Sequence, residues 1–192
     1  MPIAIAKQHY RGSPHCGDQG ACWASDGKVT LCLVDGLGHG EDAEKAAWAA
    51  LEYVAGHRAA PLAELFAGCD EALYRTRGAA MGIIVIDEAA GTLTHAGVGN
   101  TRAVVVGDKT AHLGSTAGIV GAGYGRLVPE AVPFMADDLV VMVTDGIKQR
   151  FDFADFAEMA GDDLQRLAEK ILQDWSRETD DAAVLVFKKT TK

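Results

Sequence analysis

Short apolar stretches separated by turns that contain Gly and Asp run through most of the chain and predict β-strands. Asp26-Gly27 lies between two such stretches and predicts a two-residue hairpin. Longer segments with apolar residues at helical spacing predict helices, and the three tryptophans, Trp23, Trp48 and Trp175, are expected in the core. The expected strands are 3–9, 20–25, 29–34, 80–86, 92–96, 102–106, 109–113, 138–144 and 182–188, and the expected helices are 41–56, 61–77 and 162–176.

The order of these elements predicts a layered α+β fold. Strands and helices do not alternate strictly, as they would in a doubly wound parallel sheet. Strands joined by hairpins favour two mostly antiparallel sheets that form a sandwich, flanked by helices on the outside. A length of 192 residues is typical of one domain, so residues 1–192 are expected to form a single domain. Residues 114–126 contain five glycines and predict a loop that covers the site, meets a partner or only connects two strands.

Composition and charge exclude several classes of function. The chain is 48% hydrophobic and 23% charged, which is typical of a folded globular protein. It carries 18 basic and 27 acidic residues, and the net charge of -9 argues against nucleic acid and anionic lipid as partners. No apolar run approaches the roughly 20 residues that span a bilayer, and residues 1–10 lack the apolar core of a signal peptide. The four cysteines form no C-x-x-C pattern and are expected to be reduced, so a cytoplasmic location is expected.

Three Asp-Gly pairs occur, at 26–27, 35–36 and 145–146. The ordinary role of Asp-Gly is a turn, which suits the first pair. The other two differ because each ends a continuous apolar run, LCLV before Asp35 and LVVMVT before Asp145. Loops at strand ends are places where catalytic groups gather, so these two pairs are candidate functional positions.

The predicted hairpin also sets a register. Counting back from the turn at Asp26-Gly27 places Asp18 opposite Asp35, with Cβ atoms about 5 Å apart. Like charges at that separation repel unless a cation lies between them. Two interpretations follow: a divalent metal site, or a frayed hairpin end with both acids in water.

Two further acids belong to the same pattern. Asp145 ends one expected strand and Asp180 precedes another, so antiparallel pairing would bring both to one sheet edge. Four acids at one edge, with oxygen ligands only, favour Mg²⁺ or Mn²⁺ over zinc or copper. Two such ions about 4 Å apart can share a water, lower its pKa and direct it at phosphorus.

Other sites have weaker support. Zinc bound by Cys16, Cys22 and His39 is conceivable, but the spacing matches no common arrangement. Gly36-x-Gly38 after a strand suggests part of a dinucleotide fingerprint, yet Glu41 occupies the third glycine position. A structural Ca²⁺ domain is also weaker, because the D-x-[DN]-x-[DN]-G loop is missing from the sequence.

The ordered motifs are more specific than any single one of them. They are Gly17-Asp18, Asp35-Gly36-Leu37-Gly38-His39-Gly40, Gly97-Val98-Gly99-Asn100, Val143-Thr144-Asp145-Gly146-Ile147, and Asp180-Asp181 followed by AAVLV. In this order they resemble the metal-dependent type 2C (PPM) serine/threonine protein phosphatases, in the bacterial SpoIIE-type branch. The resemblance covers nearly the whole chain. The small size, with no sensor domain, is similar to the stand-alone feedback phosphatases of the bacterial stressosome, the RsbX type.

The resemblance implies an αββα sandwich with two Mn²⁺ or Mg²⁺ ions and no other cofactor. Asp35 would bridge both ions, and the carbonyl of Gly36 would bind one of them. Asp145 and Asp180 would hold the first ion, and Asp18 would support the second. The catalytic role would thereby rest on Asp35 and Asp145, through the water that the metals activate.

The chain departs from the family pattern in places. Asp181 lies where relatives have Asp or Asn beside the ligand, and a shift of one residue would exchange it with Asp180. Many relatives have a histidine directly after Asp-Gly, where this chain has Leu37; His39 follows two residues later and is a possible general acid. Relatives also carry an arginine that grips the phosphate, for which Arg11 is the nearest candidate before Asp18.

The resemblance further implies a phosphoserine/phosphothreonine protein phosphatase. Its partners would be phosphorylated STAS-domain scaffold or antagonist proteins of the stressosome, and its action would reset a bacterial stress-response signal. Only 34 residues separate Asp145 from Asp180, which leaves no room for a flap subdomain. Docking of the partner is therefore expected through residues 114–126 and 147–153. The alternative is a non-catalytic phosphoprotein-binding module of the same fold, against which the complete aspartate set argues.

Overall fold

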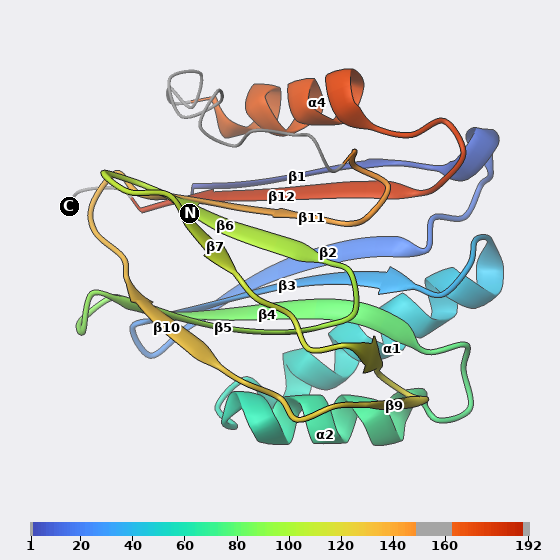
Figure 1. Ribbon diagram of the computed structural model, residues 1–192, viewed down its shortest axis with the longest axis horizontal. Helices are drawn as coiled ribbons and strands as arrows, with labels where there is room; N and C mark the ends of the chain where they lie inside the picture. The colour runs from blue at the N-terminus through green and yellow to red at the C-terminus, as the bar shows by residue number, and fades with distance from the viewer. Residues whose placement is uncertain (1, 149–162, 190–192) are drawn as a thin grey trace.

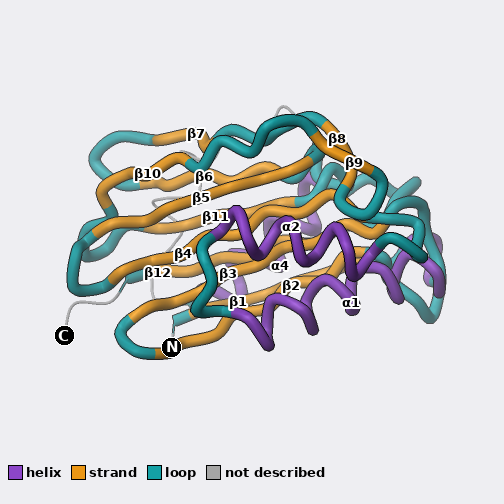
Figure 2. Tube along the Cα trace, turned by 90° about the horizontal axis from the view of Figure 1, so that it is seen from below, coloured by secondary structure: helices purple, strands orange, loops and turns teal. Residues whose placement is uncertain are grey.

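The computed structural model describes residues 2–148 and 163–189 and has four layers. From top to bottom in Figure 1 these are α4 (Leu164–Trp175), one five-stranded sheet, a second five-stranded sheet, and α1 (Glu41–His57) with α2 (Leu62–Leu73). This arrangement confirms the expected α+β fold, an αββα sandwich. Figure 2, seen from below, shows α1 and α2 lying across the outer face of the second sheet.

Both large sheets are antiparallel throughout their described pairings. Sheet A has the order β1-β12-β11-β6-β7, and sheet B has the order β10-β5-β4-β3-β2. The strands of sheet A are β1 (Ile3–Gln8), β12 (Ala182–Lys188), β11 (Leu139–Val143), β6 (Arg102–Val106) and β7 (Ala111–Leu113). Those of sheet B are β10 (Glu130–Pro133), β5 (Thr92–Val98), β4 (Ala79–Asp87), β3 (Lys28–Gly36) and β2 (Asp18–Ser25).

Three apolar layers hold the sandwich together. One lies between α4 and sheet A, one between the two sheets, and one between sheet B and the helices α1 and α2. Strand β11 shows why its sequence is continuously apolar: Val141 packs toward α4, whereas Met142 packs toward sheet B. A strand covered on both faces needs apolar residues at every position rather than at alternate ones.

Helix α1 buries the face that its sequence predicts. The small residues Ala46, Ala47 and Ala50 are completely buried, which brings the helix close to sheet B. The expectation that Trp48 belongs to the core is wrong, because its position on α1 falls outside this stripe and the residue is 48% exposed. Trp175 packs partly buried against the layer beneath α4.

Helix α2 is shorter than expected. It begins after Pro61, as predicted, but ends at Leu73 rather than near residue 77. The hydroxyl of Thr76 donates to the Leu73 carbonyl at 2.8 Å, and Gly78, with a φ of 78°, directly precedes β4.

Two connecting segments of the chain contain short strands that the sequence does not predict. Residues 114–126 contain a two-stranded sheet, β8 (Gly118–Ile119) and β9 (Gly123–Tyr124), and Val120 is buried and paired with Ala79. These contacts correct the picture of a plain connecting loop. Strand β10 was not expected at all, since it is mostly exposed and ends in Pro133, as an edge strand can.

Among the helices of the described ranges, none combines the length and the apolar character that crossing a bilayer demands.

Candidate functional site

Four aspartates lie at one end of the sandwich, the end at which α1 begins, on the right in Figure 1. Asp18 opens β2 and Asp35 lies one residue before the end of β3, so both belong to sheet B. Asp145 follows β11 and Asp180 precedes β12, which pair antiparallel in sheet A. The expectation of a single sheet edge is corrected in one respect, because the four residues come from the facing ends of two sheets.

Asp18 and Asp35 lie directly opposite each other across β2 and β3, as the hairpin register predicts. Asp26 and Gly27 adopt φ angles of 51° and 73°, both in the left-handed region that a two-residue type I′ turn requires. Asp18 is only 2% exposed, which excludes a frayed hairpin end with both acids in water.

Burial and neighbouring negative charges raise the pKa of three of these carboxyl groups, those of Asp18, Asp35 and Asp180. Burial, together with the negative charges of Asp18, Asp145 and Asp180, raises the pKa of Asp35 to about 9. Burial raises the pKa of Asp18 to about 7, aided by the neighbouring acids and opposed by a hydrogen bond with Thr144. Burial and the charge of Asp145 raise the pKa of Asp180. The four acids therefore form one electrostatic unit, in which a cation would relieve the repulsion.

One oxygen of this unit lacks a partner. Oδ2 of Asp18 is buried and accepts no hydrogen bond in the described structure. A buried carboxylate oxygen without a partner is costly, and cation binding would satisfy it. The available donors are carboxylate oxygens and the backbone carbonyl of Gly36, which are hard ligands. The residues present therefore fit a divalent cation such as Mg²⁺ or Mn²⁺.

The aspartates interact electrostatically, but their side chains do not surround a position for a metal ion. Across residues 2–148 and 163–189, no three side chains of His, Cys, Asp or Glu come near enough to enclose an ion. Cys16, Cys22 and His39, which lie within those ranges, do not come together as such a group either. What the structure brings together is an electrostatically coupled set of acids.

Asp181 has a different role from its neighbour Asp180. It is 1% exposed, and its two oxygens accept hydrogen bonds from the backbone N–H groups of Tyr10 (2.7 Å) and Gly17 (2.8 Å). Asp180 is less buried, and its Oδ1 accepts the N–H of Asp181 at 3.0 Å. Because both oxygens of Asp181 are engaged in fastening the segment before β2, Asp180 is the better candidate ligand.

Asn100 is a site residue to which the sequence assigned no role. It lies where the chain crosses from β5 in sheet B to β6 in sheet A, and its Nδ2 donates to Oδ2 of Asp145 at 2.7 Å. The preceding Gly99 has a φ of 89°, and a Cβ there would lie 2.5 Å from the Cβ of Ala80. The sequence feature that could have indicated this position is the pair of glycines in Gly97-Val98-Gly99-Asn100. These glycines permit the chain to cross from β5 to β6.

Hydrogen bonds from two different elements hold the turn that follows Asp145. From β6, Nη2 of Arg102 donates to the carbonyl of Ile147 at 2.6 Å. From the connection between α4 and β12, the N–H of Arg177 donates to the carbonyl of Gly146 at 2.8 Å. These bonds fix the backbone that carries Asp145 before any ligand arrives.

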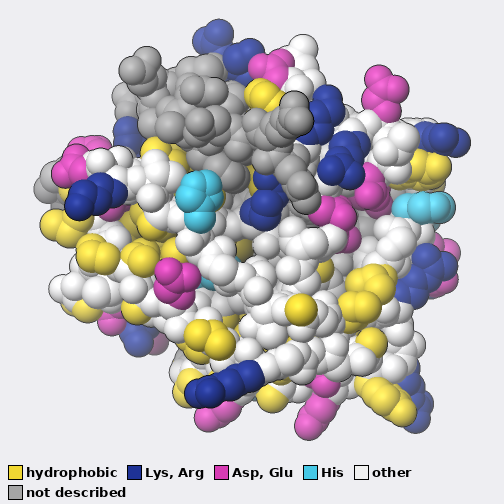
Figure 3. Space-filling view, in the orientation of Figure 1, with side chains coloured by type: hydrophobic (Ala, Val, Ile, Leu, Met, Phe, Trp, Pro, Cys, Tyr) yellow, Lys and Arg dark blue, Asp and Glu magenta, His cyan; other side chains and the backbone are white. Residues whose placement is uncertain are grey.

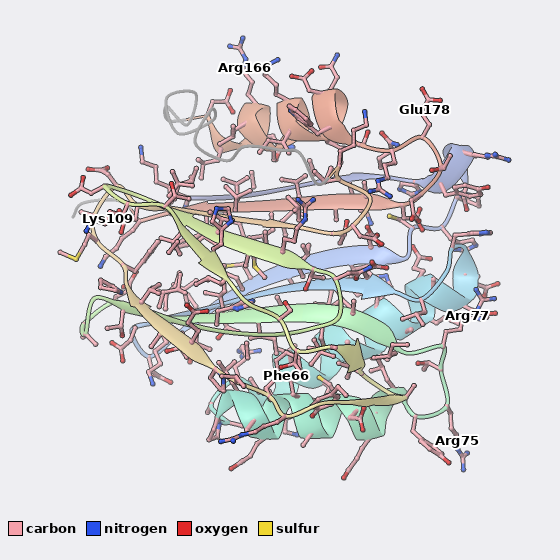
Figure 4. All side chains as sticks on the ribbon, viewed as in Figure 1. Phe66, Arg75, Arg77, Lys109, Arg166 and Glu178 are labelled. Carbon is pink, nitrogen blue, oxygen red and sulfur yellow. The ribbon has the colours of Figure 1, made fainter. Side chains whose placement is uncertain are left out.

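Aromatic and basic side chains lie beside the loop that follows Asp35. The exposed His39 ring stacks on Tyr10, with ring centroids 4.5 Å apart. Arg77, labelled in Figure 4, donates to the His39 carbonyl and forms an ion pair with Asp42. Arg11 lies 5.2 Å from the centre of the Tyr10 ring, and its role as the phosphate-gripping residue stays a prediction. In Figure 3, acidic side chains right of the centre of the face have basic side chains beside them.

The second expected docking segment, 147–153, is described only at its start. Ile147 is buried and Lys148 is exposed. Arg150, Phe151 and Phe153 lie outside the described residues.

Comparison with known proteins identifies a family and several solved structures with the same fold. The family model described as "Stage II sporulation protein E (SpoIIE)" matches residues 25–190. A protein solved in work on the bacterial stressosome, as a modular system adapted to control secondary messenger signalling, is 27% identical, with a TM-score of 0.91 and coverage of 96% of this chain and 97% of that one. No curated protein sequence matches this chain significantly.

Two further solved structures share the fold at lower identity. RsbX in complex with magnesium has a TM-score of 0.86 at 18% identity, covering 97% of this chain and 94% of that one. The PP2C phosphatase domain of SpoIIE from Bacillus subtilis, solved with a fragment of its regulatory domain, has a TM-score of 0.79 at 17% identity, covering 99% and 63%. The chain belongs to the Stage II sporulation protein E (SpoIIE) family, in the SpoIIE and Rsb branch of the type 2C (PPM) phosphatases.

Proposed function

We propose that this protein is a metal-dependent phosphoserine/phosphothreonine protein phosphatase. The observation that carries the proposal is the set of four interacting aspartates from two sheets, one of which, Asp18, has a buried Oδ2 without a hydrogen-bond partner. A non-catalytic module that only recognises phosphate would have no use for this set, since carboxylates repel phosphate. Residues 1–192 would act as one catalytic domain.

Two Mn²⁺ or Mg²⁺ ions would complete the site. Asp18, Asp35, the carbonyl of Gly36, Asp145 and Asp180 would hold these ions. When bound, such ions activate water and neutralise phosphoryl oxygens, and RsbX, which shares the fold, was solved with magnesium.

The chain's own residues would supply positioning. Asn100 orients Asp145, Asp181 fastens the segment before β2, and Arg102 holds the turn after Asp145. These contacts limit side-chain and backbone rearrangement when cation and substrate bind. His39, held by its stack on Tyr10, is the proposed proton donor to the leaving serine or threonine oxygen.

The proposed substrates are phosphorylated STAS-domain scaffold or antagonist proteins of a bacterial stressosome. Support comes from the similarity to RsbX and to a protein solved in stressosome work. The four cysteines are all free in the described structure, which suits the reducing cytoplasm where such signalling takes place.

The decisive experiment measures hydrolysis of p-nitrophenyl phosphate and of a phosphorylated STAS-domain protein, with Mn²⁺, with Mg²⁺ and with excess chelator. We expect turnover of both substrates only with metal. Activity that persists in chelator would overturn the two-metal proposal. Tight binding of the phosphoprotein without turnover under every metal condition would establish the binding module instead. Turnover of the small substrate alone would retain the phosphatase and reject the STAS-domain substrate.

A further inference from the structure

Aromatic and cationic side chains from three segments of the chain form a strip along the aspartate end of the sandwich. The segments are η1 (Tyr10–Gly12), the loop that follows Asp35, and the connection between α2 and β4. Figure 4 labels two arginines of the last segment, Arg75 and Arg77, at this end of the molecule. The members of this aromatic–cationic strip are Arg11, Tyr10, His39, Arg77, Arg75 and Tyr74.

Direct contacts join the three segments into one surface. The guanidinium carbon of Arg11 lies 5.2 Å from the centre of the Tyr10 ring. The Tyr10 ring stacks on the His39 ring, with centroids 4.5 Å apart. Nη1 of Arg77 donates to the carbonyl of His39 at 3.4 Å. The strip therefore runs without a break from η1 to the connection between α2 and β4.

The strip lies directly beside the proposed metal site. The N–H of Tyr10 donates to Oδ1 of Asp181, whose neighbour in the chain is a proposed metal ligand. The N–H of Leu37, two residues after Asp35, donates to the carbonyl of Gly78 at 3.0 Å. A protein whose phosphorylated residue reached the aspartates would therefore extend over this strip.

The side chains of the strip are available to a partner. Tyr74 is 77% exposed, more than any other large hydrophobic residue that the structure describes. Arg11 and Arg75 are exposed, and neither has an acidic partner among residues 2–148 and 163–189. Arg77 pairs with Asp42 at 3.1 Å, but both side chains are largely exposed, so an incoming carboxylate can replace Asp42 at little cost.

The composition of the strip indicates the chemistry of the partner. The whole chain has a net charge of -9, so a local row of cations favours an anionic partner at this position. Arginine binds carboxylates through paired hydrogen bonds, and arginine and tyrosine are enriched in protein interfaces. The strip continues past His39 to Tyr74 and so offers contacts beyond the position of the phosphate.

We propose that the aromatic–cationic strip binds an acidic segment of the substrate protein, next to the phosphorylated serine or threonine. Arg75 and Arg77 would pair with carboxylates of this segment, and the Tyr74 ring would pack on its backbone and aliphatic side-chain atoms. The inference rests on the proposed phosphatase function and adds the preferred sequence of the substrate. Salt screens exposed charge pairs, so the preference should weaken as the salt concentration rises.

The test uses phosphoserine peptides of equal length in which the residues flanking phosphoserine are all glutamate, all glutamine or all lysine. Phosphate release with Mn²⁺, at low and at high NaCl, gives kcat/KM for each peptide. We expect wild type to prefer the glutamate peptide over the glutamine peptide by about fivefold at low salt, mainly through a lower KM. High salt should reduce this preference.

Charge reversal at an exposed position tests the strip itself. Arg75→Glu should abolish the preference for the glutamate peptide and should raise kcat/KM for the lysine peptide above that of wild type. Turnover of the glutamine peptide and of p-nitrophenyl phosphate should stay as in wild type. The matched control is Arg166→Glu, at an exposed arginine of α4 on the opposite side of the sandwich (Figure 4), which should change none of these values.

The outcomes separate this inference from the proposed function. Equal kcat/KM for the glutamate and glutamine peptides would overturn the strip as a docking site and leave the phosphatase intact. So would a loss with Arg166→Glu as large as that with Arg75→Glu. Failure of wild type to hydrolyse any peptide or p-nitrophenyl phosphate would overturn the proposed function and this inference with it.

Discussion

The Cα atoms of Asp18 and Asp35 are direct partners across two antiparallel strands, so their carboxyl groups project from the same face. This relationship makes a carboxylate at position 35 costly without a cation. We expect Asp35→Asn to abolish phosphatase activity and yet to stabilise the metal-free protein by about 1–3 kcal/mol at pH 8, because Asp35 has to take up a proton to fold at that pH, whereas asparagine is neutral in both states. Chemical denaturation in chelator measures the stability. A metal-free variant that unfolds at lower denaturant than wild type would show that Asp35 is needed for the fold.

Cation binding should stabilise the protein as well as activate it. A ligand that binds only the folded state at a hundred times its Kd adds about 2.7 kcal/mol to the free energy of unfolding. We expect Mn²⁺ to raise the melting temperature of wild type by several degrees and to leave that of Asp35→Asn nearly unchanged. Equal shifts in both proteins would locate the metal effect away from the aspartates.

Asp180 and Asp181 should behave in opposite ways. Asp181 accepts two backbone hydrogen bonds with its two oxygens, so Asp181→Asn loses one acceptor and should cost about 1–3 kcal/mol of stability in chelator. Asp180→Asn should retain the stability of the metal-free protein and lose metal affinity. Calorimetric titration with Mn²⁺, combined with denaturation, distinguishes them. If the pattern is reversed, the ligand is Asp181.

Asn100 should contribute to metal affinity without touching the metal. Its amide donates to Oδ2 of Asp145 and fixes the direction in which the other oxygen points. Loss of such a supporting contact typically costs 10- to 100-fold in metal affinity or activity. We therefore expect Asn100→Ala to require 10- to 100-fold more Mn²⁺ for half-maximal activity, with little change in turnover at saturating metal. A lower turnover at an unchanged metal requirement would place Asn100 in contact with substrate instead.

The metal-free protein should become less stable as pH rises. Asp35 has a pKa raised to about 9, far above the value of about 4 in an unfolded chain. Between those values the folded state holds a proton that the unfolded state releases, so stability is greatest at the acidic end and falls toward pH 9. The slope is at most about 1.4 kcal/mol per pH unit for one proton.

The window from pH 7 to 9 lies above the range in which His95 titrates, and comparison with Asp35→Asn cancels the contribution of the buried cysteine thiols, whose raised pKa values act in the same direction near pH 9. The buried His95, whose pKa burial lowers to about 4, acts in the opposite direction only at lower pH. Between pH 4 and 6.5, His95 is protonated in the unfolded state and neutral in the folded state, so stability rises with pH in that range. Denaturation of wild type and Asp35→Asn in chelator at pH 7, 8 and 9 should show a decline in the former and a flatter profile in the latter. Parallel profiles would remove Asp35 as the cause.

Local patterns in the sequence predicted most of the fold and part of the site. The turn at Asp26-Gly27 sets the register, and the register alone brings Asp18 opposite Asp35. Continuous apolar runs predicted β11 and β12, because strands buried on both faces cannot alternate. Strand β10 and the β8–β9 pair were missed, since they are short and mostly exposed and owe their conformation to neighbouring strands.

Contacts between residues far apart in the chain could not be predicted in the same way. Nothing local to Asn100 indicates that its amide reaches Asp145 on the other sheet, and nothing local to Asp181 indicates its bonds to Tyr10 and Gly17. The resemblance to type 2C phosphatases supplied the expected assignment of the aspartates to two ions. Only the packing of two sheets assigns different roles to Asp180 and Asp181.

The pairing of β1 with β12 has a consequence for synthesis of the protein. The bond from Gly17 to Asp181 spans 164 residues, so a chain emerging from the ribosome cannot fasten its first aspartate until nearly all of sheet A has been made. Half-made chains would carry Asp18 and Asp35 without their counterparts from sheet A. The proposed hydrolytic activity should therefore appear only after β12 has been synthesised, and chains that lack β12 should be inactive.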